Sequence, residues 1–275
     1  MKLVIQISGS GAEHEPALHQ FAKAVSQLIS ESHRITVVFS RGNAAHSAKS
    51  ALHECLYCAQ KNYPNGNGTE AAVKGEMHNA TLPLLTERAS APLVALLSGV
   101  GVAAFGLCGA DGHILRIRKL NGHALKAWEA EVTSVNPFWL DTISNNKGVP
   151  VIENAGLGVD QNCYALDPDQ MAGACAIDWN ADALIFLTTA EGLTDADGSV
   201  VRWLETERLV ELTKRSAIAQ DMLPKLQACR HALKNGVRRA RVLPISQVDS
   251  LAMFYVSRLE CGTEVVEATG KTASA

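Results

Sequence analysis

Five short stretches that combine glycine with polar residues each follow an apolar, strand-like run of this 275-residue chain. Parallel strands bring their carboxyl ends to one edge of a sheet, and the ligands of α/β proteins bind there. Simple turn chemistry explains glycine in any single loop, but five loops gathered at one edge favour an anionic ligand. The stretches are Ser8–Gly11, Ser40–Gly42, Gly109–Gly112, Asn154–Gly156 and Thr188–Gly192.

Gln6 is the polar residue of the first apolar run, LVIQI, which leads into the loop that begins at Ser8. A site that handles the charge of a nucleotide would favour a lysine in such a place. Glutamine donates a hydrogen bond without charge, and a charge-assisted bond is roughly twice as strong as a neutral one. The glutamine therefore raises the question of whether a cation has been replaced here.

Strand-like runs alternate with amphipathic, helix-like segments, which predicts an α/β fold with mainly parallel strands. Residues 92–97 fit either a helix end or a strand, residues 62–69 are typical of a loop, and residues 191–204 are typical of a hairpin loop. We expect strands at 3–7, 34–39, 102–112 (with a tight turn), 114–120, 149–156, 183–189, 240–245 and 263–268. We expect helices at 15–30, 44–60, 69–86, 171–179, 207–215 and 223–235.

The composition is that of a globular chain, with 47% hydrophobic residues and a net charge of −3. Such a charge gives no reason to expect nucleic acid or an acidic membrane as partner. No apolar stretch is long enough to span a bilayer, and the first apolar run ends without a signal-type cleavage site, so we expect a cytoplasmic protein. Seven scattered cysteines are an odd number and argue against a disulfide framework.

One cluster of metal-ligating residue types stands apart from the glycine loops. The sequence H-E-C-L-Y-C at 53–58 has a Cys-x-x-Cys spacing that can hold zinc. No second Cys-x-x-Cys accompanies it, and the spacing also suits an apolar helix face. A metal-binding module therefore stays open beside a structural helix, with these candidate ligands: His46, His53, Cys55, Cys58 and His78.

Three stretches resemble, in order and spacing, the motifs of the amino acid kinase family, and within it most closely those of the acetylglutamate kinases. They are L-D-P-D-Q-M-A-G-A-C-A at 166–176, L-I-F-L-T-T-A-E-G-L-T-D-A-D-G at 184–198, and D-M-L-P-K-L-Q-A-C at 221–229. G-L-C-G-A-D-G at 106–112 and G-T-E-V-V at 262–266 are similar to two further family motifs. The resemblance covers nearly the whole chain apart from about residues 43–90.

The resemblance implies a three-layer αβα sandwich with an open, mainly parallel sheet. It implies one continuous domain, with an acceptor-binding half at 1–180 and a half at 181–275 that binds ATP with Mg²⁺, the metal being held mainly by the phosphates. The implied reaction transfers the γ-phosphoryl group to the carboxylate of an amino acid derivative, as in arginine biosynthesis. A homodimer is implied as well, without the arginine inhibition that an additional N-terminal helix gives some members.

The resemblance also assigns roles to individual residues. Lys225 matches the family's second catalytic lysine, and Asp169 matches the aspartate that orients both lysines. A lysine in the first turn of a helix opposes the helix dipole, which favours a function for it, whereas an aspartate at a helix start also suits an N-cap. The residues that match the nucleotide-binding stretches are Thr189, Ala190, Glu191, Gly192, Leu193, Thr194, Ala217, Ile218 and Ala219.

Several positions depart from the family pattern. Gln6 stands where the family has its first catalytic lysine, and Thr189 stands where it has an aspartate. The acceptor-binding asparagine falls on Ala165, the acceptor-binding arginine has no match, and Asp221 replaces a glycine. The loops expected to face phosphate and acceptor hold Ser8, Gly9, Arg41, Gly42 and Ala165.

Two further interpretations follow from these departures. In a working kinase, Arg41 supplies the missing positive charge, because arginine is always charged and binds phosphate in a fork. In a pseudo-kinase, the same site binds nucleotide or amino acid, and the chain acts as a regulatory or partner subunit. The retention of both Asp169 and Lys225 favours the kinase.

Overall fold

The computed structural model describes residues 1–41, 89–120, 130–159, 163–195, 197–215, 218–253 and 261–267. The described strands are β1 Lys2–Gly9, β2 Arg34–Arg41, β3 Ala104–Cys108, β4 Leu115–Lys119, β5 Ala130–Val135, β6 Val149–Glu153, β7 Ala155–Leu157, β8 Cys163–Ala165, β9 Ala183–Thr188, β10 Trp203–Glu205, β11 Arg239–Pro244 and β12 Thr263–Val266. The described helices are α1 Ser10–Glu13, α2 Glu15–Ser30, α5 Ala91–Gly99, α6 Pro137–Asn145, α7 Pro168–Asp178, α8 Thr206–Lys214 and α9 Leu223–Lys234, with 3₁₀ turns η1 Asp111–His113 and η2 Ile245–Met253.

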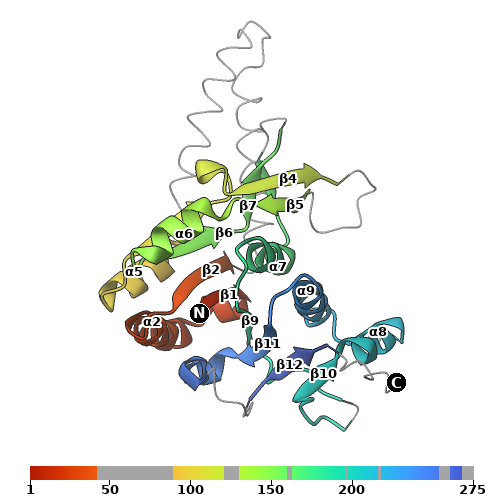
Figure 1. Ribbon diagram of the computed structural model, residues 1–275. Coiled ribbons are helices and arrows are strands. Elements are labelled where there is room, and N and C mark those ends of the chain that lie inside the picture. Colours follow the sequence, from red (N-terminus) through yellow and green to blue (C-terminus); the bar gives the residue numbers. More distant parts are fainter. Residues whose placement is uncertain are drawn as a thin grey trace, which may run out of the picture.

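The main sheet has eight described strands in the order β10-β12-β11-β9-β1-β2-β6-β3. The strands from β11 to β3 are all parallel, β12 is antiparallel to β11, and β10 is parallel to β12. Two small antiparallel sheets, β4-β5 and β7-β8, lie beyond the main one. The predicted α/β class with a mainly parallel open sheet is confirmed (Figure 1).

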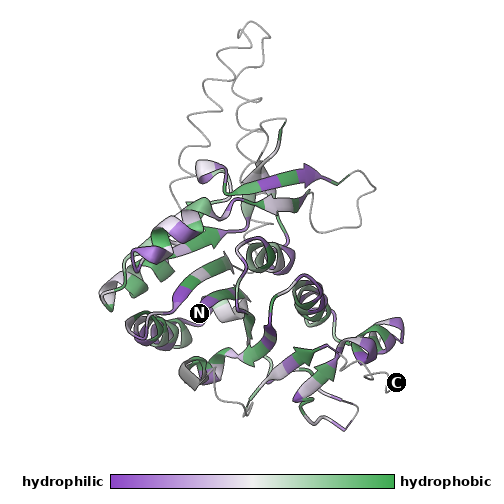
Figure 2. Cartoon of the chain, in the orientation of Figure 1, coloured by the Kyte–Doolittle hydropathy of each residue, from purple (hydrophilic) through white to green (hydrophobic). Residues whose placement is uncertain are grey.

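Helices cover both faces of the sheet and define two cores. One core joins Val4, Val38 and Phe186 of the sheet to apolar residues of α6, α7, α8 and α9. The other joins Ile5 and the opposite sides of the strands to α2, α5 and η2. Figure 1 shows α7 and α9 on one side of β1 and β9 and α2 on the other, and Figure 2 shows apolar residues concentrated in the central strands. The face that carries α7 and α9 is called the α7 face below.

Most predicted elements inside the described residues are confirmed within a few residues of their expected ends. The ambiguous run at 92–97 is the helix α5, and the predicted hairpin at 191–204 contains an antiparallel bridge between Thr194 and Val200. The pattern analysis gave no element for residues 130–145, where the structure has β5 and α6. The expected helices at 44–60 and 69–86 and the metal-ligand cluster lie outside the described residues.

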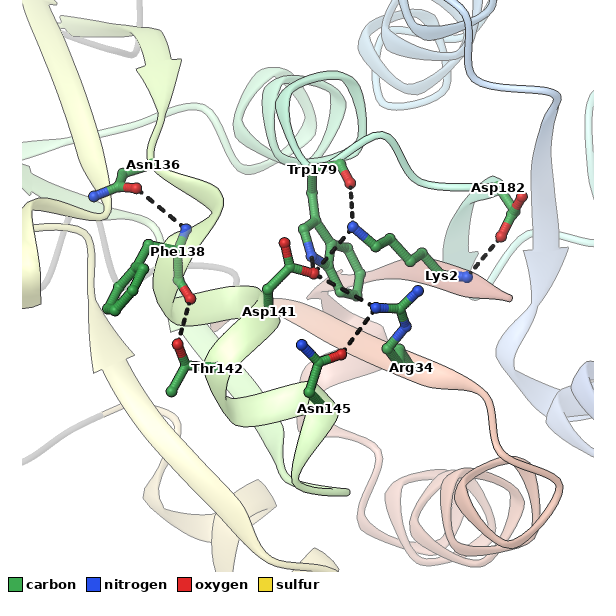
Figure 3. Close-up of polar contacts among 9 residues, drawn as sticks. All are labelled: Lys2, Arg34, Asn136, Phe138, Asp141, Thr142, Asn145, Trp179 and Asp182. Carbon is green, nitrogen blue, oxygen red and sulfur yellow. Dashed lines mark hydrogen bonds and ion pairs between the residues drawn. The ribbon is translucent and has the colours of Figure 1, made fainter.

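At the amino-terminal edge of the sheet, a cluster of polar residues ties β1 and β2 to α6 and the end of α7 (Figure 3). The Nζ of Lys2 donates to the main-chain oxygen of Trp179 at 3.0 Å and lies 3.0 Å from Oδ1 of Asp141. The same Oδ1 accepts from the buried indole Nε1 of Trp179 at 3.0 Å. Arg34 donates to Asn145 at 2.9 Å beside them. This amino-edge cluster lies at the opposite end of the strands from the glycine loops.

Replacing Asp141 by alanine is expected to lower the free energy of unfolding by about 1–3 kcal/mol, because the Trp179 indole N–H would be buried without an acceptor. Burial alone would raise the pKa of Asp141, but hydrogen bonds from Lys2 and Trp179 outweigh it and lower the pKa below its usual 3.8. The contribution of Asp141 is therefore present above about pH 4 and is lost as the pH falls below it. Urea unfolding of Asp141→Ala beside Glu131→Ala, which removes only a surface ion pair with Arg118, checks this; equal losses would contradict it.

No described helix is long and apolar enough to cross a lipid bilayer.

Candidate active site

All five glycine-containing loops follow parallel strands, β1, β2, β3, β6 and β9, so their starting points share the carboxyl edge of the sheet, as predicted. The first loop is tightly built. Gly9 has φ 60° and ψ −141°, a conformation that is essentially restricted to glycine, and it lets the chain turn directly into α1. No atom lies within 4 Å of where a Cβ of Gly9 would be, so the space beside it is open.

A row of neutral polar residues crosses this edge on the α7 face. Ser8 pairs with Ser40 across β1 and β2, and each stands two residues after a residue on the α7 face. Asn154 and Thr188 stand two residues beyond Ile152 and Phe186, which pack in the same core, and so extend the row along the end of β6 and of β9. Ser40, Asn154 and Thr188 are buried, and Ser8 is half-buried. These four residues are called the polar row.

Gln6 lies one step below the polar row on the α7 face, between Val38 of β2 and Phe186 of β9. Its side chain is completely buried, and neither Nε2 nor Oε1 has a hydrogen-bond partner among the described residues. A buried amide without partners destabilises a fold by about 1–3 kcal/mol per lost interaction. Such exceptions are rare in native proteins and point to a partner that arrives with a ligand.

Above the sheet, Lys225 and Asp169 form a buried ion pair between α9 and α7. The Nζ of Lys225 donates to both carboxylate oxygens of Asp169, each at 3.0 Å. The exposed fractions are 11% for the lysine side chain and 8% for the aspartate side chain. Lys225 is therefore not an exposed lysine on a solvated helix face.

Asp169 is not the N-cap of α7 either. That cap is Asp167, whose side chain accepts from the main-chain N–H groups of Asp169 and Gln170. The Asp169 carboxylate is thus left entirely to Lys225. The sequence left two roles open for Asp169, that of a helix cap and that of a functional residue. The structure excludes the capping role, because Asp167 fills it.

Burial raises the pKa of Asp169 from 3.8 to about 6, against the opposing effect of Lys225. Asp167 and Asp221 add to the increase through their negative charges. Asp221 is exposed and precedes α9. The described part of the site therefore has two further aspartates whose charges act on the Asp169–Lys225 pair.

Activity is expected to fall as the pH decreases through about 6, because protonation of Asp169 removes the carboxylate that holds Lys225. The stability contribution has the opposite sign. Since the folded-state pKa is the higher one, this group stabilises the fold below about pH 4 and loses that contribution as the pH rises through about 6. The pH profile of kcat for wild type and Asp169→Asn checks this; an acidic limb that survives the substitution would contradict the assignment.

The segment predicted to bind nucleotide follows β9. The N–H of Leu193 donates to Oγ1 of Thr263 at 2.8 Å, which fixes the segment to the start of β12. Gly192 has φ 136°, and a Cβ there would lie 2.8 Å from Thr263 Oγ1 and from Val200. Thr189, Glu191 and Thr194 are exposed at this edge, Ala190 is half-buried, and Gly192 and Leu193 are buried.

The other predicted nucleotide stretch is described only in part. Ile218 is 9% exposed and packs in the core of the α7 face, so its side chain offers little surface to a ligand. Ala219 is exposed, and its carbonyl oxygen accepts from the N–H groups of Met222 and Leu223 before α9. Ala217 lies outside the described residues.

On the acceptor side, Ala165 is half-buried and pairs with Ala155 across β7 and β8. The main chain of Arg41 pairs with Gly9, because the first two strands are neighbours in the sheet. Gly42 and the side chain of Arg41 lie outside what the structure describes. The sequence analysis gave no individual role to Asp167 or to three residues of the polar row, Ser40, Asn154 and Thr188. The available signal for the row was that polar residues end apolar strands.

Within the described residues, no three His, Cys, Asp or Glu side chains come together as a metal-binding group. Both oxygens of Asp169 are engaged by Lys225. The Asp169 carboxylate is therefore not available as a metal ligand while this ion pair is intact.

The profile of the amino acid kinase family matches residues 1–244 of the chain. That match spans most of the sequence and both sides of the site described above, from Gln6 to Lys225. The chain belongs to the amino acid kinase family.

Within this family, two acetylglutamate kinases are similar to the chain over nearly its whole length. Acetylglutamate kinase of Acidobacterium capsulatum is 36% identical over 266 residues, which make up 97% of this chain and 99% of that protein. Acetylglutamate kinase of Koribacter versatilis is 32% identical over 267 residues, with 97% and 99% coverage. These two relatives match the chain over its whole fold, not only over one half.

Solved structures share the fold at lower identity. N-acetylglutamate synthase from Neisseria gonorrhoeae, complexed with coenzyme A and N-acetyl-glutamate, aligns with a TM-score of 0.71 at 17% identity, over 97% of this chain and 59% of that one. Carbamate kinase from Giardia lamblia bound to AMP-PNP aligns with a TM-score of 0.60 at 12% identity, over 97% and 98%. The predicted amino acid kinase-like sandwich is confirmed by these neighbours.

Proposed function

We propose that this protein transfers the γ-phosphoryl group of ATP to the side-chain carboxylate of N-acetylglutamate, as a step of arginine biosynthesis. The observation that carries the proposal is the buried Lys225–Asp169 pair, set over a carboxyl edge lined with hydrogen-bonding residues. The whole-length similarity to acetylglutamate kinases supports the same choice of acceptor.

In the proposed step, a carboxylate oxygen of the acceptor attacks the γ-phosphorus of ATP. The bond from that phosphorus to the β–γ bridging oxygen breaks, and an acyl phosphate and ADP are formed without net proton transfer. Such a reaction needs positioning and positive charge more than covalent participation of the protein. Lys225 supplies the charge, and Asp169 holds its ammonium group in place.

Gln6 would donate a neutral hydrogen bond to the transferred group from below, and Arg41 is the candidate for a second positive charge. Mg²⁺ bound to the phosphates would neutralise part of their charge. Since the charges of two further aspartates act on the Asp169–Lys225 pair of the described site, the proposed reaction depends strongly on that ion.

We also propose that the two halves of the chain bind different substrates. Residues 1–180 would bind the acceptor, and residues 181–275, including the segment 189–194, would bind ATP. We place the protein in the cytoplasm, because the reaction consumes ATP.

The direct test mixes purified protein with MgATP and N-acetylglutamate in the presence of hydroxylamine, which traps an acyl phosphate as a hydroxamate. Hydroxamate formation that requires both substrates is the expected result. A panel of related acids identifies any other acceptor. Binding of ATP without turnover on any acid would contradict the proposal and would favour a pseudo-kinase subunit.

We further propose a homodimer that forms through β3. Among the described strands, β3 is bonded to β6 alone and ends the sheet. Phe105 on β3 is 48% exposed, and Phe138 and Trp139 on α6 are 60% and 40% exposed. The exposed aromatic rings on β3 and α6 form an apolar surface that suits symmetric packing against a second copy.

Light scattering after size-exclusion chromatography is expected to show twice the chain mass of 29.3 kDa. Phe105→Lys is expected to shift the species toward the monomer. A wild-type monomer, or a dimer unaffected by the substitution, would contradict this interface.

A further inference from the structure

The carboxyl edge has an order that follows from the sheet. Strands β9, β1, β2 and β6 are consecutive neighbours, so the polar row runs Thr188, Ser8, Ser40, Asn154. Strands are spaced about 4.8 Å apart, so Thr188 and Asn154 are separated by about 14 Å. With the nucleotide beside β9 and the phosphoryl group near Gln6, the β6 end of the row faces the acceptor; this step rests on the proposed function.

Asn154 is held in one orientation by two hydrogen bonds to Leu166. The side-chain Nδ2 of Asn154 donates to the main-chain oxygen of Leu166 at 2.9 Å. The main-chain oxygen of Asn154 accepts from the Leu166 N–H, also at 2.9 Å. A carbonyl accepts only from the amide nitrogen, so the partner fixes which side-chain atom is Nδ2. No described residue donates to Oδ1, which is the remaining acceptor of a side chain that is 7% exposed.

Small side chains and the segment that leads into α7 lie next to Asn154. The next residue, Ala155, pairs with Ala165, and both are half-buried with only a methyl side chain. Leu166 precedes Asp167, the cap of α7, and Asp169 follows in the first turn of that helix. Asn154 is therefore anchored to the same segment that carries the aspartate of the Lys225 pair.

We propose that Asn154 determines acceptor specificity, its Oδ1 accepting a hydrogen bond from the nitrogen on the α-carbon of the acceptor. Either an acylated amide N–H or a free ammonium group supplies that donor. A dicarboxylic acid of the same length without nitrogen cannot make the bond. A site that presents a buried polar group discriminates strongly against a ligand that leaves the group unpaired.

The test compares kcat/KM of wild type and Asn154→Ala for N-acetylglutamate, glutamate and glutarate in the hydroxamate assay. Wild type is expected to favour a nitrogen-bearing acid over glutarate. Asn154→Ala is expected to lose about 10- to 100-fold on that acid and less than about twofold on glutarate. The comparison of N-acetylglutamate with glutamate shows whether the donor is an amide or an ammonium group.

Two further variants separate binding from structure. Asn146→Ala removes a similar bond from a side-chain amide to a carbonyl, that of Thr142, far from this edge, and is expected to leave the selectivity unchanged. Asn154→Asp keeps an acceptor oxygen but loses the donor to Leu166, so the preference for the nitrogen-bearing acid is expected to persist while Tm falls. Equal losses on all three acids in Asn154→Ala would overturn the inference.

Calorimetry keeps the inference testable if the wild type shows no turnover. Tighter binding of N-acetylglutamate or glutamate than of glutarate, abolished in Asn154→Ala, would support Asn154 while the proposed function fails. Absence of binding by all three acids would overturn both.

Discussion

Replacing Lys225 by methionine is expected to lower kcat for hydroxamate formation by about 100- to 1000-fold. Removal of one preorganised donor to developing charge in a dry site costs about that much in other enzymes. The loss here is expected at the upper end, because the described part of the site contains no second lysine beside Asp169, and the negative charges of Asp167 and Asp221 remain. The hydroxamate assay at saturating MgATP measures it.

The fold is expected to survive this substitution. Lys225 lowers the pKa of Asp169, so its loss raises the pKa of that carboxyl further and favours its neutral form. Protonation of Asp169 then reduces the cost of leaving its buried charge unpaired, which would otherwise be several kcal/mol. Lys234→Met, at an exposed position of the same helix α9, is the matched control. Turnover of Lys225→Met within threefold of wild type would contradict a role in the transfer.

Most of the sheet could be predicted because the alternation of apolar runs and amphipathic helices is strong. The strand at 183–189 follows the clear helix at 171–179, and parallel pairing follows from such crossovers. The elements at 130–145 could not be found in this way. β5 alternates over only six residues, Ala130–Val135, and α6 is short, with exposed aromatic residues Phe138 and Trp139 on its surface.

The individual residues of the candidate site could be predicted from the sequence, but the contact between Asp169 and Lys225 could not. Sequence motifs pointed to Asp169 and Lys225, yet the residues are 56 positions apart, and only the packing of α7 on α9 brings them together. The cap at Asp167 shows the same limit, because two aspartates at a helix start look alike in sequence. The register of β1, β2 and β6, which aligns Ser8, Ser40 and Asn154, is also a property of the sheet rather than of any one strand.

Gln6 is unusual both in the sequence and in the structure. A glutamine in an apolar strand breaks the local pattern, and natural sequences accept such a conflict mainly at functional sites. The structure shows how large the conflict is, since both amide atoms are buried without partners in the described ranges of the chain. The unligated protein is thus destabilised by the two unpaired amide atoms of Gln6. A bound phosphoryl group could accept a hydrogen bond from Nε2 and so remove the part of this cost that the donor causes.

Replacing Gln6 by methionine is therefore expected to stabilise the unligated protein and to impair its activity. The substitution keeps the length of the side chain and removes two unsatisfied polar atoms, so the free energy of unfolding should rise by about 1–3 kcal/mol. The lost neutral hydrogen bond should lower kcat by about tenfold, less than the loss of Lys225, because no charge is removed. Urea unfolding without ligand and the hydroxamate assay measure the two effects.

Thr36→Val is the matched control for the higher stability and lower kcat expected of Gln6→Met. Thr36 lies on β2 opposite Val4 and is completely buried, and in the part of the chain that the structure describes its Oγ1 has no hydrogen-bond partner. Its place near the amino end of the strands removes it from the site, so valine should stabilise the fold and leave kcat unchanged. If Gln6→Met behaved like Thr36→Val, the amide of Gln6 would have no part in the reaction; if it destabilised the protein, the amide would have a structural partner instead. Stabilisation in both variants with lost activity only at Gln6 would show that this buried glutamine is retained for its ligand.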